Sequence, residues 1–145
     1  MVPNQQLIEQ LKRDEGAVLD ANGYHKPYQD SLGIWTIGYG HNCQTNPITD
    51  AAANQILVDD IAKAEASVLR EWPWAQDLDI PRRNVLINMV FNMGLAKVRG
   101  FVNFLECLKQ GQYINAAEHM LDSLWAKQVG DRAKRLAEVI RWGHG

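Results

Sequence analysis

The stretch of sequence that decides the fold is YQDSLGIWTIGYGH, residues 28–41. Within it, Ile34 to Ile37 are all β-branched or aromatic residues, which favour a strand. The four residues before them, Asp30 to Gly33, have the composition of a tight turn. Glycines follow at positions 38 and 40. The segment therefore predicts a short, glycine-rich β structure.

The sequence before this stretch predicts a helix. Asn4 is a suitable N-cap, and Leu7 and Leu11 recur at helical spacing on one face. Gly16 is a suitable residue for the end of that helix. From 17 to 47, glycine and proline separate short β-rich segments, so we expect a small β lobe there.

The sequence after the β lobe is helical in character. Thr49 is expected to cap a helix over 50–71, with Pro73 just beyond its end. A second helix should start at Pro81, and residues 85–91 are apolar nearly all round. Such a helix is buried at the centre of a bundle.

Glycines at 94, 100 and 111 divide the remainder into short helices, and we expect the last two over Tyr113–Trp125 and Asp131–Trp142. The predicted fold class is α+β. We expect one domain, 1–145, with its ligand site in a cleft between a β lobe and a helical lobe. Its predicted parts are a β lobe at about 17–47, a connecting helix at about 50–71, and a helical lobe at about 81–145 joined by the N-terminal helix.

Composition excludes several classes of protein. With 145 residues, 46% hydrophobic and 22% charged, the chain has the size and composition of one folded domain. We expect no secretory signal, because residues 1–10 lack a basic stretch followed by an apolar run, and no run of about 20 apolar residues, as a bilayer span needs, occurs in these 145 residues. We therefore expect a protein made and held in a cytoplasm.

Cys43 and Cys107 are not part of a CxxC pair, so we expect two free thiols.

Charge is distributed unevenly along the chain. Residues 1–80 carry 5 Lys and Arg against 12 Asp and Glu, a net charge of −7, whereas residues 81–145 carry 10 against 5, a net charge of +5. A basic half could face an anionic polymer such as nucleic acid or cell wall. Solvated helix faces would give the same counts, so charge alone leaves both interpretations open.

Single residues carry little chemical information here. Glu15 stands at a helix end, where the helix dipole and partial burial would disfavour its charged form, as a general acid requires. Asp30 taken alone is an ordinary turn residue, and His41 could be a base, a metal ligand or a structural residue. Four scattered histidines without ligand spacing argue against a metal site. There is no GxSxG motif, and Gly38-Tyr39-Gly40 lacks the rest of a dinucleotide fingerprint.

The joint arrangement is far more specific. Asp14-Glu15-Gly16 is followed by the pattern Asp-x-x-Gly-x-x-Thr-Ile-Gly-x-Gly-His at residues 30–41, which resembles the tailed-phage lysozyme family. The resemblance continues in residues 83–94, in Gly100-Phe101, in Trp125 and in residues 132–135. It covers nearly the whole chain in the right order, and it implies a lysozyme-like α+β fold.

The resemblance implies a role for each matching residue. Glu15 would be the general acid, while Asp30 and Thr36 would position the attacking water. His41 would lie beside the cleft in a structural hydrogen bond or ion pair, and Arg132 would approach Glu15. The substrate-binding residues that it implies are His41, Phe91, Asn92 and Arg132. No metal and no cofactor are implied.

The loop between Glu15 and Asp30 departs from the family pattern. It is long and contains a rival carboxylate, Asp20. We expect Asp30 to be the functional residue, because Asp20 has no matching turn and strand after it.

The activity that the resemblance implies is that of an endolysin. This hydrolase cuts the β-1,4 bond between N-acetylmuramic acid and N-acetylglucosamine in peptidoglycan, with inversion. We expect a monomer that binds peptidoglycan strands, binds no nucleic acid and does not insert into membranes. It would accumulate in the cytoplasm of a host bacterium and reach the wall after release through a holin.

Three alternative functions fit the sequence less well. A lytic transglycosylase cleaves the same bond but typically manages with one glutamate, so Asp30 and Thr36 count against it. A non-catalytic wall-binding module would not need these residues together. A nucleic-acid binder could use the basic residues of the C-terminal segment, but this function does not explain the glycine-rich β lobe.

Overall fold

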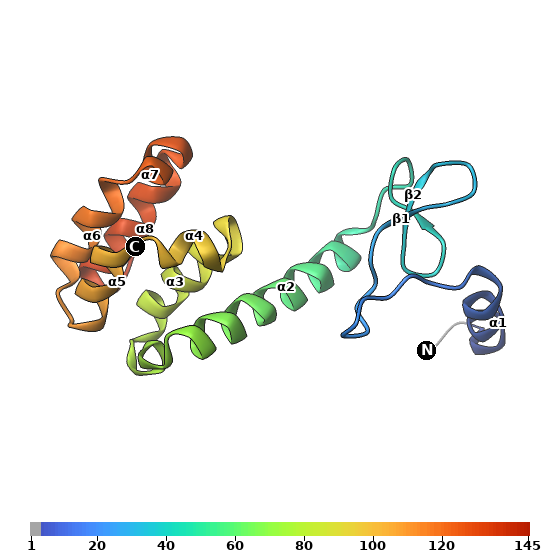
Figure 1. Cartoon of the computed structure of the whole chain (residues 1–145), viewed down its shortest axis with the longest axis horizontal. Coiled ribbons are helices and arrows are strands. Elements are labelled where there is room, and N and C mark those ends of the chain that lie inside the picture. The colour runs from blue at the N-terminus through green and yellow to red at the C-terminus, as the bar shows by residue number, and fades with distance from the viewer. Residues whose placement is uncertain (1–3) are drawn as a thin grey trace. The chain divides into compact units, whose positions relative to one another are not determined.

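The computed structural model describes residues 4–145, and its fold is α+β, as the sequence predicts. The chain divides into two compact units, Met1–Ala53 (unit 1) and Asn54–Gly145 (unit 2). Helix α2 (Asp50–Glu71) begins in unit 1 and continues into unit 2 (Figure 1). The assignment of the whole chain to a single catalytic domain remains a prediction.

Unit 1 starts with helix α1 (Gln5–Glu15), whose bounds confirm the prediction. The Asn4 side chain accepts a hydrogen bond from the Leu7 N–H at 3.1 Å, which satisfies one of the free donors of the first turn. At the other end Gly16, with φ of 67°, donates its N–H to the Lys12 carbonyl. No residue of α1 is buried. By its contacts α1 belongs to unit 1 together with the β segment, and its grouping with the helical lobe stays a prediction.

The β segment forms a three-stranded antiparallel sheet in the order β1-β2-β3. The strands are β1 (Tyr28–Gln29), β2 (Trp35–Ile37) and β3 (His41–Asn42). Thr36 at the centre of β2 pairs with Tyr28 on one side and with Asn42 on the other. Paired residues share a face of a sheet, so these three side chains lie on one face and the neighbouring pair Ile37 and His41 on the other.

Helix α2 has the bounds that the sequence predicts, and Thr49 caps it by accepting a hydrogen bond from the Ala52 N–H at 3.1 Å. Its apolar stripe is buried only in the C-terminal half. Ala64 and Val68 are buried, whereas Ile56 is 53% exposed.

Unit 2 is helical and contains the main core. After the short helix η1 (Pro73–Asp77) come α3 (Ile80–Met93), α4 (Leu95–Arg99), α5 (Val102–Lys109), α6 (Tyr113–Leu121), α7 (Leu124–Val129) and α8 (Asp131–Trp142). The α3 segment is buried through most of residues 85–90, as its apolar run predicts, although Phe91 is exposed. The largest fully buried side chains in the described chain are Phe104, Leu86, Met89, Leu108, Met120, Ile140, Val68 and Val98. No helix within residues 4–145 combines the length and apolar character needed to span a membrane.

The prediction of one helix over Tyr113–Trp125 is wrong, because the chain breaks it at Ser123. The Ser123 hydroxyl donates to the Met120 carbonyl at 2.7 Å and accepts from the Ala126 N–H at 3.1 Å. One side chain therefore ends α6 and caps α7.

Charged side chains fix the ends of several helices in unit 2. Arg99 on α4 donates two hydrogen bonds, of 2.6 and 2.9 Å, to the Glu71 carboxylate at the end of α2. This hydrogen-bonded pairing lowers the pKa of Glu71 and raises the pKa of Arg99. Arg82 donates to the Ile140 and Arg141 carbonyls and so satisfies the C-terminal end of α8.

The two cysteines are free thiols, as the sequence predicts. Cys43 follows β3 and is exposed, whereas Cys107 on α5 is half-buried.

Candidate active site

Glu15, the predicted general acid, is the last residue of α1, and its side chain lies against the backbone of Gly40. A Cβ atom added at Gly40 would meet Oε2, Cδ and Cγ of Glu15 at 3.0 to 3.1 Å, so any larger residue there would require the Glu15 side chain to shift by a few tenths of an ångström. Glu15 is otherwise exposed, and the partial burial expected from the sequence is not found. The helix end nevertheless delivers the carboxylate to the turn between β2 and β3.

Asp30 leads the tight turn between β1 and β2, as predicted. Its Oδ1 accepts hydrogen bonds from the N–H groups of Leu32 and Ile34, at 2.8 and 3.0 Å. The Gly33 N–H closes the turn on the Asp30 carbonyl. None of the described residues donates to Oδ2, so half of this carboxylate remains available for another partner.

Asp20 leads a turn of the same construction, which contradicts the expectation that it has none. Its Oδ1 accepts from the N–H groups of Asn22 and Tyr24 at 2.8 and 2.9 Å, and the Gly23 N–H bonds to its carbonyl. The two turns differ in the structure that comes after them. Asp30 is followed by strand β2, whereas only an isolated bridge between Leu19 and His25 flanks the Asp20 turn.

Thr36 is buried, with 4% of its surface exposed, and lies close to Asp30. Its hydroxyl donates to the Ile34 carbonyl at 3.0 Å, and the Asp30 N–H donates to the same oxygen at 2.9 Å. Oγ1 of Thr36 and N of Asp30 therefore lie within about 6 Å of each other. Alternation from Tyr28 also puts Asp30 on the Thr36 face of the sheet.

His41 begins β3, directly after Gly40. Its Nε2 is buried and is the one buried side-chain nitrogen or oxygen among residues 4–145 without a hydrogen-bond partner. The structural hydrogen bond expected of His41 is therefore not made at this atom. Buried polar atoms without a partner are rare in folded proteins.

Three predicted residues remain, and all of them belong to unit 2: Phe91, Asn92 and Arg132. The side chains of Asn92 and Arg132 have polar partners. Arg132 on α8 donates from Nε and Nη2 to the Asn88 side-chain oxygen, at 3.2 and 2.7 Å. Asn92 on α3 accepts a hydrogen bond of 2.8 Å from the Trp125 indole. Phe91 is 43% exposed, so it is a surface residue of α3.

These residues line two separate pockets of unit 2. Phe91 and Arg132 line a pocket of about 410 Å³, together with Leu57, Ile61, Glu65, Asn84, Ile87 and Asn88. Asn92 lines a second pocket, of about 590 Å³, with Trp125, Phe101, Gln128 and other residues of α3, α4 and α7. Both pockets mix apolar surface with amide and charged groups, which suits a polar ligand with apolar faces.

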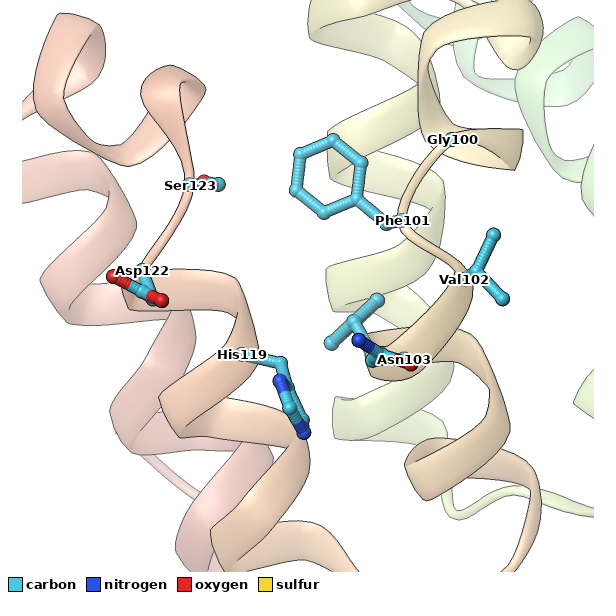
Figure 2. Close-up of a pocket in the computed structure, with 8 residues that line it drawn as sticks. Gly100, Phe101, Val102, Asn103, His119, Asp122 and Ser123 are labelled. Atoms are coloured by element: carbon cyan, nitrogen blue, oxygen red, sulfur yellow. The ribbon is translucent and has the colours of Figure 1, made fainter.

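A third pocket of unit 2 contains none of the predicted residues. It has a volume of about 260 Å³ and lies between the α4–α5 and α6–α7 connections. Figure 2 shows His119 of α6 projecting toward the gap, opposite Asn103 of α5. It is the smallest of the three, and we assign it no part in the site. Within residues 4–145, no three His, Cys, Asp or Glu side chains gather as a metal site would require.

Comparison with known proteins decides the family. The profile of the phage lysozyme family matches residues 20–140, which includes Asp30, Thr36 and His41 and begins just after Glu15. The chain belongs to the phage lysozyme family. Membership supports a glycoside hydrolase that acts on peptidoglycan.

The names of individual relatives agree with this family assignment. The "Endolysin" of Acyrthosiphon pisum secondary endosymbiont phage 1 is 31% identical over 84% of this chain and 80% of its own length. "Probable T4-type lysozyme 1" of Dictyostelium discoideum is 27% identical over 94% of both chains. The "Pre-baseplate central spike protein Gp5" of Enterobacteria phage T4 is 30% identical over 98% of this chain, which spans only 28% of that protein.

Two residues that contact the predicted site residues were not singled out from the sequence. Gly40 was recognised as a glycine of the β lobe and of the family pattern, but no contact with Glu15 was expected of it, although the glycines at 38 and 40 flanking Tyr39 were a signal for an unusual turn. Asn88 lies inside the apolar run of α3 and was not singled out. A polar residue there is a signal for a specific partner, and the partner is Arg132.

The contact between Gly40 and Glu15 gives a testable prediction. In Gly40→Ala the new methyl group would displace the Glu15 carboxylate, so we expect hydrolysis of purified peptidoglycan to fall at least about tenfold, since small misplacements of reacting groups have large effects. Gly38→Ala is the matched control. Gly38 also has a positive φ, 66° against 86°, but a Cβ there meets nothing within 4 Å.

Both alanine variants carry a similar backbone strain, about 1–2 kcal/mol. Their melting temperatures should therefore fall together while their activities separate. Equal activities at equal folded concentration would show that the Glu15 contact has no role in catalysis.

Proposed function

We propose that this protein is an endolysin of the muramidase type, an inverting hydrolase of the β-1,4 bond between N-acetylmuramic acid and N-acetylglucosamine. The observation that carries the proposal is the sharing of the Ile34 carbonyl by the Thr36 hydroxyl and the Asp30 amide. It brings the backbone of Asp30 close to the Thr36 hydroxyl at the start of β2, while Glu15 lies against Gly40 beyond the other end of that strand. Family membership supports the same chemistry.

In the proposed reaction Glu15 donates its proton to the glycosidic oxygen as the bond to the anomeric carbon breaks. A water attacks that carbon from the opposite face and gives up a proton to Asp30. Oδ2 of Asp30 can accept one hydrogen bond from the water, and the Thr36 hydroxyl, which donates to Ile34, still has lone pairs to accept another. The water is thereby oriented before it attacks.

The two proposed carboxylic residues contact opposite ends of one short strand. Ile34 bonds to Asp30, and Ile37 pairs with His41 next to Gly40. Ile34, directly before β2, and Ile37, at its end, are three residues apart, so their backbones lie about 10 Å apart. Inverting enzymes hold their carboxyl groups about 6.5–9.5 Å apart, against about 5–5.5 Å in retaining ones.

The proposed substrate-binding residues are His41, Phe91, Asn92 and Arg132. Phe91 offers an exposed aromatic face to a sugar ring, and Asn92 retains its amide N–H groups while its oxygen accepts from Trp125. Arg132, oriented by Asn88, keeps further donors for an anionic group of the substrate.

The reaction class is tested by the products of purified peptidoglycan, separated by chromatography and identified by mass spectrometry. A hydrolase leaves a reducing N-acetylmuramic acid end, which is the expected result. An anhydro-muramic end would identify a lytic transglycosylase. Retention on the wall without any product would identify a binding module instead.

Thr36→Val tests the role of water. Valine keeps the shape but removes the hydroxyl, and the Ile34 carbonyl keeps its bond from Asp30, so no buried acceptor is left unpaired. We expect turnover to fall at least about tenfold, because orienting the water is worth several kcal/mol, with little change in melting temperature.

The parent enzyme should release the α anomer, seen by NMR before mutarotation. A β product would mean that Asp30 attacks the sugar directly. Either that result or full activity in Thr36→Val would remove the proposed role of the water.

The cellular part of the proposal is that a monomer accumulates in the host cytoplasm and reaches the wall through a holin. Similarity to a phage endolysin supports it. Sedimentation of the purified protein tests the monomer. Immunoblots of infected-cell lysates and purified virions test the location, and a signal confined to virions would favour a spike component, as the similarity to Gp5 allows.

A further inference from the structure

The last turn of α1 contacts the β2–β3 turn at two consecutive residues, Tyr39 and Gly40. Lys12 and Glu15 are three residues apart in α1 and therefore lie on the same side of the helix. The Lys12 ammonium lies over the Tyr39 ring, 5.2 Å from its centroid, while Glu15 lies against Gly40. A cation at this distance from an aromatic face is attracted to it.

Tyr39 is itself held from a second direction. The His25 ring packs edge-on against it, with centroids 4.9 Å apart and an interplanar angle of 73°. His25 pairs with Leu19 in the segment that directly follows α1. One ring therefore contacts both the last turn of the helix and the chain that leaves it.

Within unit 1, hydrophobic burial does little to fix this helix. No residue of α1 is buried, and Leu7 and Leu11 on its apolar face are each 43% exposed. Within unit 1, the position of the end of α1 therefore depends on specific side-chain contacts. The contact of Lys12 with Tyr39 adjoins that of Glu15 with Gly40 and fixes the same turn of helix.

We propose that Tyr39 is a positioning residue for the general acid: its ring holds Lys12, and through it the last turn of α1, so that the Glu15 carboxylate stays at Gly40. This inference rests on the proposed function, in which Glu15 donates the proton. Tyr39 acts through Lys12 and has no contact with the substrate in this role. Its effect should therefore fall on the chemical step.

The test uses the full chain and soluble peptidoglycan fragments, so that kcat and KM are measured separately. We expect Tyr39→Leu and Lys12→Met each to lower kcat about ten- to a hundredfold, since a misplacement of about 1 Å can have that effect, with KM little changed. Tyr39→Phe, which keeps the ring, and Lys12→Arg, which keeps the cation, should restore most of kcat. The double variant should be no slower than either single one.

Lys26→Met is the matched control, because it removes the same charge from an exposed lysine of unit 1. Parental kcat in Tyr39→Leu, or equal losses in Lys26→Met and Lys12→Met, would overturn the inference. So would a kcat loss in Tyr39→Phe as large as in Tyr39→Leu. If one of these outcomes is found while Glu15→Gln is inactive in the same assay, only the role of Tyr39 is overturned and the proposed acid stands. If Glu15→Gln is fully active, the proposed acid and this inference fall together.

Discussion

Glu15→Gln is expected to lower the hydrolysis of peptidoglycan by about 10²- to 10⁴-fold, the usual contribution of a general acid. Glutamine has the shape of glutamate, so it can occupy the space beside Gly40 without displacing the backbone. It cannot donate an acidic proton to the leaving oxygen. The loss should therefore appear in activity, measured as the clearing of a purified wall suspension, with the circular dichroism spectrum unchanged.

Glu9→Gln is the control for this result. Glu9 is an exposed carboxylate on the same helix, where it accepts a 2.8 Å hydrogen bond from Gln5. Surface changes of this kind have small effects, so Glu9→Gln should clear the suspension at the parental rate. Activity of Glu15→Gln within about tenfold of the parent, at equal folded concentration, would refute the assignment of the acid.

The second large effect is expected for Asp30→Asn, which should lower activity about a hundredfold or more while Asp20→Asn changes it less than about twofold. The structure makes this comparison unusually well matched. Both aspartates use Oδ1 to accept two turn N–H groups, and asparagine can accept the same two bonds. Both variants should therefore keep their turn and similar melting temperatures.

Asp30 and Asp20 differ in the structure that follows their turns. Only the Asp30 turn leads into β2, where Thr36 shares the Ile34 carbonyl with the Asp30 amide. Asparagine at position 30 could still bind a water but could not accept its proton. If Asp20→Asn were the inactive variant, Asp20 would be the carboxylate opposite the acid, and the assignment of the long loop would have to be reversed.

Helix boundaries could be predicted from the sequence because capping is local. Asn4 and Thr49 each accept a hydrogen bond from an N–H three residues later, so the residues that decide the start of α1 and of α2 lie side by side in the chain. The burial of α3 was predictable for a related reason. An apolar run without a polar face has no stable position at a surface.

Two local signals were present and were misread. Ser123 has the residue type of an N-cap, but the helical pattern continues on both sides of it, and periodicity alone predicted one helix across 113–125. The Asp-x-x-Gly pattern at 30–33 also occurs at 20–23. Both copies fold into the same turn, so the turn by itself could not distinguish Asp30 from Asp20.

The sequence by itself thus determined most of the helices, the short sheet, the family and the residue types available for catalysis. Only the tertiary structure decided which of these residues meet. The contact of Glu15 with Gly40, the burial of Thr36, the unpaired Nε2 of His41 and the bond between Arg132 and Asn88 all belong to this second group. Each depends on how the folded turns and helices bring together residues that are far apart in the sequence. Periodicity and capping describe only the few residues around each position, and so they could not specify these contacts.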